Sequence, residues 1–317
     1  MRAPWIGVYE PLLGTTVEVR VWADEEPAAR AAQGAVVDEV VRLTAVFSRF
    51  EANSELCRWA RSELDDVSAD LATGLELAQR WFLASAGAFH PVCRVLQQRW
   101  EQAVSDQVMP DPNELLSLAM GLAQLPFHVE RRDGTAYLER PGDCRGVDLD
   151  AVAKGHIVDR AIEEARAVPG VRSVLVNAGG DLRHDGPGSI TVRIEDPHHP
   201  FENAEPLGRV AVGRAALATS GTAHRGFRVG ERWFGHVIDP RTGWPVQCTA
   251  SASAIAADAA TADAVATAVM VLGPEEGLGF VDSLDGVAAL LIADDGAVYR
   301  SSRWPEPAAP GTHHRSR

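Results

Sequence analysis

One segment constrains the fold of this chain more than any other: residues 258–272, DAATADAVATAVMVL. At helical spacing this segment is apolar almost all round, and a helix of that kind is buried in the interior of a protein. The chain has 317 residues, of which 46% are hydrophobic, so it is long enough to enclose such a helix without disulfide staples. We therefore expect this helix at the centre of a folded domain.

An acidic residue, Asp263, lies in the middle of this apolar helix, and Thr267 follows four residues later on the same face. A lone buried carboxylate is costly unless it is paired or binds a metal. A carboxylate next to a hydroxyl is a hard-oxygen pair that suits Mg²⁺. The alternative is that this face meets solvent, since Val265 and Val269 lie on the opposite side.

The remaining periodicity predicts a single α+β domain with mixed or antiparallel sheets and flanking helices, covering residues 1–302 and followed by a disordered tail at 303–317. The predicted helices cover residues 25–46, 68–85, 112–122, 151–167, 259–272 and 274–283. The predicted strands cover residues 15–22, 127–130, 137–140, 173–177, 189–195, 209–212, 216–219, 236–238, 250–256, 287–293 and 297–300.

Charge and cysteine usage narrow the possible classes of function. The formal net charge of −14 argues against binding to nucleic acid or to anionic membranes, so an anionic ligand would need local help. The four cysteines are far apart, which indicates reduced thiols rather than a zinc site or a disulfide framework. With neither a secretory signal nor a run of ~18 apolar residues, we expect a soluble cytoplasmic protein without a membrane span.

The segment GVDLDAVAKGHIVD contains two unfavourable choices for the start of a helix. Asp148 or Asp150 can cap the helix, but Lys154 places a cation where the helix dipole disfavours it. Gly155, which comes next, costs about 1 kcal/mol relative to alanine inside a helix. A phosphate bound at this helix N-terminus would explain both residues. The alternative is an exposed lysine beside a glycine that is required for close packing.

The segment GHVIDPRTGWPV carries an unusual set of polar groups for a turn. The Asp-Pro pair ends a short strand and starts the turn, which brings His236, Asp239, Arg241 and Thr242 close together. These side chains offer an imidazole, a carboxylate, a guanidinium and a hydroxyl. Asp-Pro and Thr-Gly are also ordinary turn sequences, so a purely structural loop is the alternative.

Two glycine-containing segments could bring the backbone close to a ligand. In VLVNAGGDL, Gly179 and Gly180 permit a positive φ or a close approach, although the pattern is not that of a dinucleotide-binding fold. In LATSGTAHRGF, Ser220 and Gly221 could help to form a nest of amides and hydroxyls for an anion. A plain turn and a plain loop are the respective alternatives.

Taken together, these segments resemble the FAD:protein FMN transferase family, also called the ApbE family. The resemblance extends from about residue 13 to residue 300 and includes, in the family's order, FSRFEANSEL, GAFHPVCRVL, VDLDAVAKGHIVD, VLVNAGGDL, LATSGTAHRGF, GHVIDPRTGWPV and TADAVATAVMVLG. It implies a single α+β domain that binds FAD and Mg²⁺. It also implies transfer of FMN from FAD to a Thr or Ser hydroxyl of a target protein, with release of AMP.

The resemblance also implies site residues. By position, Asp263, Thr267 and the backbone oxygen of Ala151 match metal ligands. The expected flavin-nucleotide contacts are Leu13, Phe50, Ala88, Phe89, His90, Asp148, Lys154, Val237 and Ile238, together with Gly179, Gly180, Ser220 and Gly221 from the two glycine-containing segments. The chain departs from the family at His90, where Asp is usual, and at Phe50, where Tyr is frequent.

For the chemistry, we expect His236 to accept the proton of the attacking hydroxyl, because its unperturbed pKa lies near neutrality. Asp239 is the competing candidate, and a purely turn-shaping role is open for both. Two other functions are open: a Mg²⁺-dependent FAD pyrophosphatase, in which water replaces the acceptor hydroxyl, and a flavin-binding protein without turnover.

Overall fold

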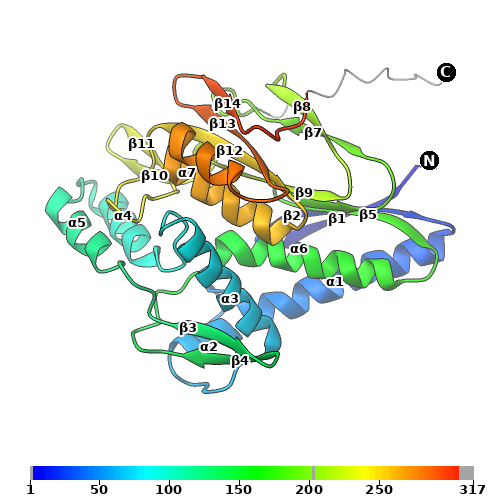
Figure 1. Ribbon diagram of the computed structural model, residues 1–317, viewed down its shortest axis with the longest axis horizontal. Helices are drawn as coiled ribbons and strands as arrows, with labels where there is room; N and C mark the ends of the chain where they lie inside the picture. The colour runs from blue at the N-terminus through cyan, green and yellow to red at the C-terminus, as the bar shows by residue number, and fades with distance from the viewer. Residues whose placement is uncertain (1–2, 202–203, 307–317) are drawn as a thin grey trace.

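The computed structural model describes residues 3–201 and 204–306, and it is built around one eight-stranded sheet (Figure 1). Every neighbouring pair in this sheet is antiparallel, in the order β1-β2-β5-β6-β9-β12-β13-β14. The strands are β1 (Trp5–Leu12), β2 (Thr15–Ala23), β5 (Val171–Ala178), β6 (Asp181–Asp185), β9 (Ala215–Gly221), β12 (Thr249–Ala256), β13 (Ala288–Ala293) and β14 (Val298–Arg300).

Three long helices pack on one face of this sheet: α1 (Glu26–Phe47), α6 (Asp150–Ala167) and α7 (Ala259–Asp282) (Figure 1). The alternation in β2 explains this packing, because Val17, Val19 and Val21 are fully buried against the helices. Helix α7 is enclosed as predicted. A kink at Gly273 divides it into the two expected helical pieces, since Gly273 has a φ of 75° and precedes a proline.

The other face of the sheet carries a smaller apolar cluster under a hairpin formed by β7 (Ile190–Ile194) and β8 (Gly208–Val212). The remaining elements are α2 (Glu55–Ala60), α3 (Ala69–Ala84), α4 (Arg94–Asp106), α5 (Pro112–Met120) and the hairpins β3 (His128–Arg132) with β4 (Thr135–Glu139) and β10 (Gly226–Val229) with β11 (Arg232–Gly235). The structure therefore has the predicted α+β architecture, with antiparallel sheets and flanking helices.

Several elements differ from the sequence-based expectation. Strands β1 and β6, helices α2 and α4, and the hairpin β10–β11 were not predicted, whereas the expected strand at 236–238 is reduced to one bridge between Ile238 and Pro245. Helix α4 buries only Leu96, Trp100 and Ala103, so its apolar stripe is narrow. Strand β6 is short and polar, and it is a strand because β5 and β9 pair with it on either side.

The packed part of the chain extends slightly past its predicted end. The predicted tail begins at residue 303, yet the Arg303 side chain donates to the carbonyls of Val287 and Val281, so the packed domain reaches beyond residue 302. Residues 307–317 of that tail lie outside the described residues.

Among the described residues, α7 alone is long and apolar enough to cross a membrane, and 56% of its most apolar window is buried inside the protein. The cytoplasmic location stays a prediction.

Candidate functional site

The candidate site lies where the first turns of α6 approach α7, and Gly155 makes that approach possible. A Cβ atom at Gly155 would lie 2.6 Å from the backbone nitrogen of Ala260 and closer still to the carbonyl of Ala259. Asp159, one turn further along α6, accepts hydrogen bonds from the amides of these two residues, at 2.8 and 3.0 Å. Gly155 therefore has the close-packing role that was one of the two interpretations of its position.

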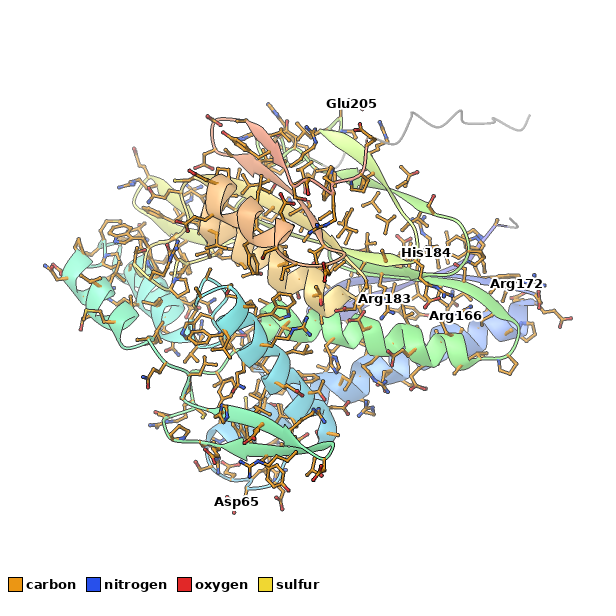
Figure 2. The ribbon with its side chains drawn as sticks, in the orientation of Figure 1. Asp65, Arg166, Arg172, Arg183, His184 and Glu205 are labelled. Carbon is orange, nitrogen blue, oxygen red and sulfur yellow. The ribbon has the colours of Figure 1, made fainter. Side chains whose placement is uncertain are left out.

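A basic residue of β6 completes this junction. Arg183 donates to Asp159 at 2.8 Å, and Figure 2 shows Arg183 beside the start of α7. Burial raises the pKa of Asp159 to about 6, against the lowering effect of its hydrogen bonds and of Arg183. The start of α7 is thus fixed to both α6 and the sheet.

Asp263 is the most constrained polar group of the site. Its side chain, on α7, is buried in the core, and the nearby backbone of Gly155 acts to lower the pKa of its carboxyl group. Its Oδ2 atom is buried and has no hydrogen-bond partner among the described residues. Burial, reinforced by the nearby Asp181, raises the pKa of Asp263 well above its usual value, and Lys154 opposes this shift. The prediction that this carboxylate is buried is confirmed, and the alternative of a solvent-facing position is wrong.

The residues around Asp263 fit a hard divalent cation. An unpartnered buried carboxylate oxygen is a position that a cation would satisfy. The hydroxyl of Thr267, on the next turn of α7, lies 3.2 Å from the hydroxyl of Ser220 on β9. The described residues contain no group of three or more His, Cys, Asp or Glu side chains placed to hold a metal ion, and the donors near the Asp263 carboxylate are hydroxyls of Thr267 and Ser220. These are the donors that Mg²⁺ prefers, and Ala151 lies in the first turn of α6, which faces this region.

Lys154 forms an ion pair with Asp181, the first residue of β6. Burial by itself would lower the pKa of Lys154, but the charges of Asp181 and Asp263 outweigh this effect and raise it. The lysine is therefore a permanent cation, and 28% of its side chain is exposed. Neither the exposed-lysine nor the phosphate-binding interpretation holds in full. The ammonium is not free on the surface, because Asp181 binds it, and a phosphate would share it with that carboxylate.

The amino end of α6 also carries a network of alternating charges. Arg49 contacts the carboxylates of Asp148, at 3.0 Å, and of Asp150, at 2.7 Å. Asp148 accepts a hydrogen bond from the first helical amide, that of Asp150, at 2.9 Å. Burial raises the pKa of Asp148 to about 6, and Asp150 adds to the shift while Arg49 opposes it. The side chain of Phe50 is 76% exposed, with the Arg49 guanidinium 4.0 Å from its ring centre.

His236 has the environment of a neutral imidazole. Its Nδ1 atom is buried and has no hydrogen-bond partner among the described residues, while its backbone amide donates to the carbonyl of Arg225 at 3.1 Å. Burial lowers the pKa of His236 to about 4, and the charges of Arg225 and Lys154 lower it further. The imidazole therefore keeps a free lone pair at neutral pH.

Asp239, in contrast, is fully engaged in its turn. Its carboxylate accepts from the backbone amide and from two guanidinium nitrogens of Arg241, each at 2.9 Å, while its backbone carbonyl accepts from Gly243 at 2.8 Å. Arg241 also donates to the carbonyl of Val271 in α7. This geometry favours the turn-shaping role for Asp239 and leaves His236 as the candidate proton acceptor.

The glycine-containing segments form the strand ends that border the site. Gly179 and Gly180 are the two loop residues of the tight hairpin between β5 and β6, with φ values of 63° and 104°. The amide of Gly179 donates to the carbonyl of Thr16, next to the turn that contains Leu13. Ser220 and Gly221 end β9, beside α7. The segment Gly179-Gly180 therefore forms the plain turn that was one of its two interpretations. The turn leads into β6, whose first residue, Asp181, forms the ion pair with Lys154.

The other expected flavin contacts are mostly buried. Ala88 and Phe89 are each 2% exposed, and Val237 and Ile238 are also buried. The imidazole of His90 is used in the fold, since its Nε2 atom lies 2.8 Å from the carbonyl of Leu122 and its Nδ1 atom accepts from the amide of Val92. Burial lowers the pKa of His90, which keeps it neutral.

Sequence reasoning missed several charged residues of the site. Asp181 and Arg225 occur within the segments that were noted, but nothing in their spacing indicates that Asp181 pairs with Lys154 or that Arg225 acts on His236. Arg49 lies within FSRFEANSEL, a segment noted for its resemblance alone. Each of these contacts joins residues that are distant in sequence.

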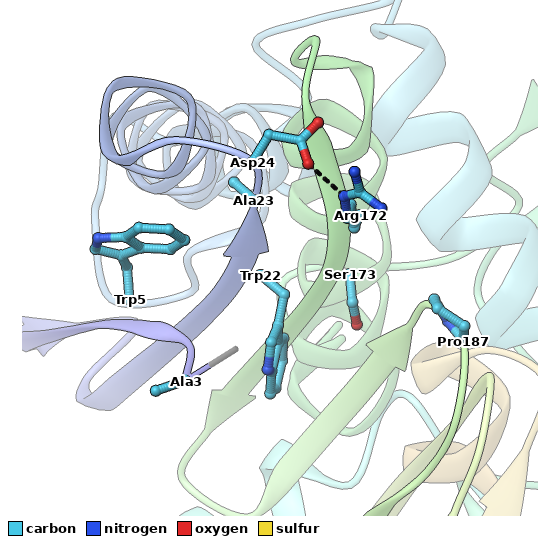
Figure 3. Close-up of a pocket in the computed structure, with 8 residues that line it drawn as sticks. All are labelled: Ala3, Trp5, Trp22, Ala23, Asp24, Arg172, Ser173 and Pro187. Carbon is cyan, nitrogen blue, oxygen red and sulfur yellow. Dashed lines mark hydrogen bonds and ion pairs between the residues drawn. The ribbon is translucent and has the colours of Figure 1, made fainter. Parts of the chain in front are cut away.

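A cavity of about 440 Å³ lies elsewhere, at the opposite end of the strands (Figure 3). Trp5, Trp22 and Ser173 line it, and an ion pair between Asp24 and Arg172 borders it. Ser173 is at the start of β5, whereas Gly179 and Gly180 follow its end. The cavity is therefore separate from the candidate site.

Known proteins that are similar to this chain cover most of its length. The model of the ApbE family matches residues 13–291. The FAD:protein FMN transferase of Treponema pallidum is 31% identical over 92% of this chain and 86% of its own length. The enzyme of the same name from Rhodobacter capsulatus is 29% identical over 91% of this chain, which spans about half (55%) of that protein. The crystal structure of the ApbE protein from Thermotoga maritima superimposes with a TM-score of 0.78, at 24% identity, over 94% of this chain and 97% of that one.

The family match covers the amino end of α6, the hairpin turn at Gly179 and Gly180, and the Asp263 region of α7 together. These are the elements that the structure joins into one site. The chain therefore belongs to the ApbE family.

Proposed function

We propose that this chain is an FAD:protein FMN transferase, which uses Mg²⁺ to move FMN from FAD onto a Thr or Ser hydroxyl of a target protein and releases AMP. The family and its curated FAD:protein FMN transferases support the flavin-transfer activity. One observation supports the dependence on a metal: the buried Oδ2 atom of Asp263 has no hydrogen-bond partner in the part of the chain that the structure describes, and the Thr267 hydroxyl lies one turn away.

In this reaction one bond forms and one breaks. The acceptor hydroxyl oxygen bonds to the phosphorus on the FMN side of the FAD pyrophosphate, and the bridging P–O bond to AMP breaks. The hydroxyl proton must leave during the attack, and AMP departs with the electron pair of the broken bond. The protein therefore needs positive charge around the pyrophosphate and a base near the attacking oxygen.

Asp263, Thr267 and the carbonyl of Ala151 would hold the ion. When bound, Mg²⁺ would neutralise the negative charge that develops on the phosphoryl oxygens. Lys154 supplies a fixed cation at the same place, since its ion pair with Asp181 keeps it charged and oriented. The positive end of the α6 dipole also points to this region, with Asp148 capping the Asp150 amide and Arg49 bound to both carboxylates.

His236 is the proposed base. A pKa of about 4 makes the imidazole neutral but weakly basic in the free protein. Two of the causes of that low value are the cations Arg225 and Lys154, and a bound pyrophosphate would offset both charges. We therefore expect substrate binding to raise the pKa of His236 towards neutrality, where proton transfer is efficient.

One experiment tests this proposal against its two alternatives. The purified chain is incubated with FAD, Mg²⁺ and candidate acceptor proteins, and the products are examined on a denaturing gel and by chromatography. Transfer gives a fluorescent protein band together with AMP. Free FMN and AMP without a labelled protein would instead indicate a pyrophosphatase, and bound FAD without AMP release would indicate a binding protein.

A further inference from the structure

Strand β1 forms one edge of the eight-stranded sheet, and it lacks the features that usually keep such an edge from pairing. In the part of the chain that the structure describes, β1 pairs with β2 alone. The opposite edge, β14, is only three residues long and carries the exposed charge of Arg300. In β1, by contrast, residues 5–9 contain no charge, no proline and no bulge, and the register shift comes only after Tyr9. Proteins normally protect an exposed edge by shortness, charge, proline or a bulge, so this edge is open to another strand.

The alternation of backbone hydrogen bonds shows which residues of β1 face the open edge. The carbonyl of Thr16 accepts from the turn that follows β5, at 3.2 Å, so Thr16 directs its backbone groups towards β5. Successive residues of a strand face opposite neighbours, so Val17 faces β1, where its partner is Tyr9. By the same alternation, Ile6 and Val8 direct their N–H and C=O groups away from the sheet. No described residue outside β2 hydrogen-bonds to them.

The side chains at this edge are apolar on both faces of the sheet. Ile6 and Val8, on the face away from the long helices, are 58% and 60% exposed. Trp5 and Tyr9, on the helix face, are half-buried. Gln33 of α1 donates to the Trp5 carbonyl at 3.3 Å, which fixes the start of the strand. The edge is therefore held in place before any partner arrives, which lowers the entropy cost of association.

The stretch from Trp5 to Tyr9 is complementary to a second copy of itself. Antiparallel pairing about a two-fold axis at Gly7 places Ile6 of one copy opposite Val8 of the other. In this register the outward N–H and C=O groups of these two residues bond to each other. The same register places Trp5 of one copy opposite Tyr9 of the other, so the cross-strand pairs are aliphatic on one face and aromatic on the other. A two-fold interface requires a surface of this self-complementary kind.

We propose that this chain forms a two-fold dimer in which the β1 strands of two copies pair antiparallel about Gly7 and join the two sheets into one. Charge favours this edge over most other surfaces. Each copy has a formal net charge of −14, which opposes close approach, whereas residues 5–9 bring no charge to the junction. The dimer does not depend on the proposed transferase function.

Sedimentation equilibrium of the full chain tests the dimer. A junction of this small size should have a dissociation constant on the order of 10 µM. At about ten times that concentration we expect twice the chain mass of 34.0 kDa, with a return to the single mass on dilution. Ile6→Lys together with Val8→Lys should raise the dissociation constant by at least about tenfold, because the lysines bring like charges together across the junction. Both side chains are exposed in the single chain, so its fold should not change.

Leu83→Lys together with Met120→Lys is the matched control. It adds the same charge at two exposed apolar side chains, on α3 and α5, and should dimerise like the wild type. A wild type that stays monomeric at the higher concentration would overturn the dimer. So would dimerisation that survives unchanged when Ile6 and Val8 are both lysine.

Cysteine cross-linking tests the register, in a Cys248→Ser background that removes the exposed thiol. Opposite residues of a hydrogen-bonded antiparallel pair have Cα atoms about 5.5 Å apart, which a disulfide can span. A mixture of the Ile6→Cys and Val8→Cys proteins should therefore give a cross-linked band on a non-reducing gel after mild oxidation. Either protein alone should give none, because its two cysteines would lie diagonally, about 7–8 Å apart or more. A band from Ile6→Cys alone, or none from the mixture, would overturn the pairing about Gly7.

Discussion

At the scale of single residues, the carboxylate of Asp263 has a cost to stability that only a ligand would offset. Its pKa in the folded protein is raised, chiefly by burial, so between the unfolded and folded pKa values the folded state binds more protons. The free energy of unfolding therefore falls as pH rises through that range. Above that range the cost of the buried charge is complete unless a cation is bound.

We expect Asp263→Asn to separate stability from function. Without Mg²⁺, the variant should be at least as stable as the wild type, because it removes a buried carboxyl whose charged form is disfavoured by burial and by Asp181. Mg²⁺ should raise the melting temperature of the wild type alone, and flavin transfer should fall by about 10²-fold or more. Calorimetry with and without Mg²⁺ and an assay of AMP release measure these effects.

Glu275→Gln is the control for that variant, because Glu275 is an exposed acid on the same helix. It should leave both the Mg²⁺ response and the transfer rate at wild-type values. A full Mg²⁺ response and full activity in Asp263→Asn would remove this residue from the metal site.

His236 should give the protein a measurable dependence of stability on pH. Its pKa is about 4 in the folded state, against about 6.5 in an unfolded chain, so the unfolded state binds more protons between these values. The free energy of unfolding should therefore decrease by up to ~3 kcal/mol as pH falls from 6.5 towards 4. His236→Gln should flatten this part of the profile, as measured by urea unfolding at a series of pH values.

Exposed His128 on β3 provides the comparison, since His128→Gln should keep the wild-type slope. A His236→Gln profile that coincides with the wild type would show that the imidazole titrates normally and would contradict its burial. The same variant should lose flavin transfer by about 10²-fold or more if the imidazole accepts the hydroxyl proton.

At the scale of elements, the contact between α6 and α7 forms the framework of the site. Gly155 allows the two helices to touch, and Asp159 satisfies the first amides of α7. The same contact brings the backbone of Gly155 near the carboxyl group of Asp263. The packing of α6 on α7 therefore also fixes the position of Asp263, the proposed metal ligand.

We expect Gly155→Ala to destabilise the protein by about 2–3 kcal/mol, because the added Cβ would overlap backbone atoms of Ala259 and Ala260 that have no room to move. This loss should outweigh the gain of ~1 kcal/mol from the greater helix propensity of alanine. Gly34→Ala in α1 is the matched control, since its Cβ would meet no atom within 4 Å. It should stabilise by about 0.5–1 kcal/mol in the same chemical-denaturation experiment.

At the scale of the whole molecule, one sheet joins the two ends of the chain. Strand β1 lies at one edge and β14 at the other, and α7 packs with α6 in a common core. We expect a single unfolding transition by calorimetry, with near- and far-ultraviolet circular dichroism changing together. FAD with Mg²⁺ at about 100 times the dissociation constant should raise the free energy of unfolding by ~2.7 kcal/mol without dividing that transition. Two separate transitions would contradict the single domain.

The sequence by itself predicted the features that depend on local periodicity and turn chemistry. The burial of α7 and of Asp263 follows from a pattern that is apolar almost all round the helix, and the turn at Gly179 and Gly180, one of two interpretations of that segment, follows from two adjacent glycines. The turn that contains Asp239 was likewise predicted from its Asp-Pro and Thr-Gly pairs. These signals lie within one segment, so they require no knowledge of distant contacts.

The tertiary structure alone decided how those segments meet. Strand β6 has little apolar signal of its own, yet its pairing with β5 and β9 places Asp181 against Lys154. The Gly155 position had two interpretations until Ala259 was found against it. Likewise, the low pKa of His236 comes from burial and from charges that lie elsewhere in the sequence. Such effects depend on distances across the core, which sheet register and helix packing fix and which no single segment encodes.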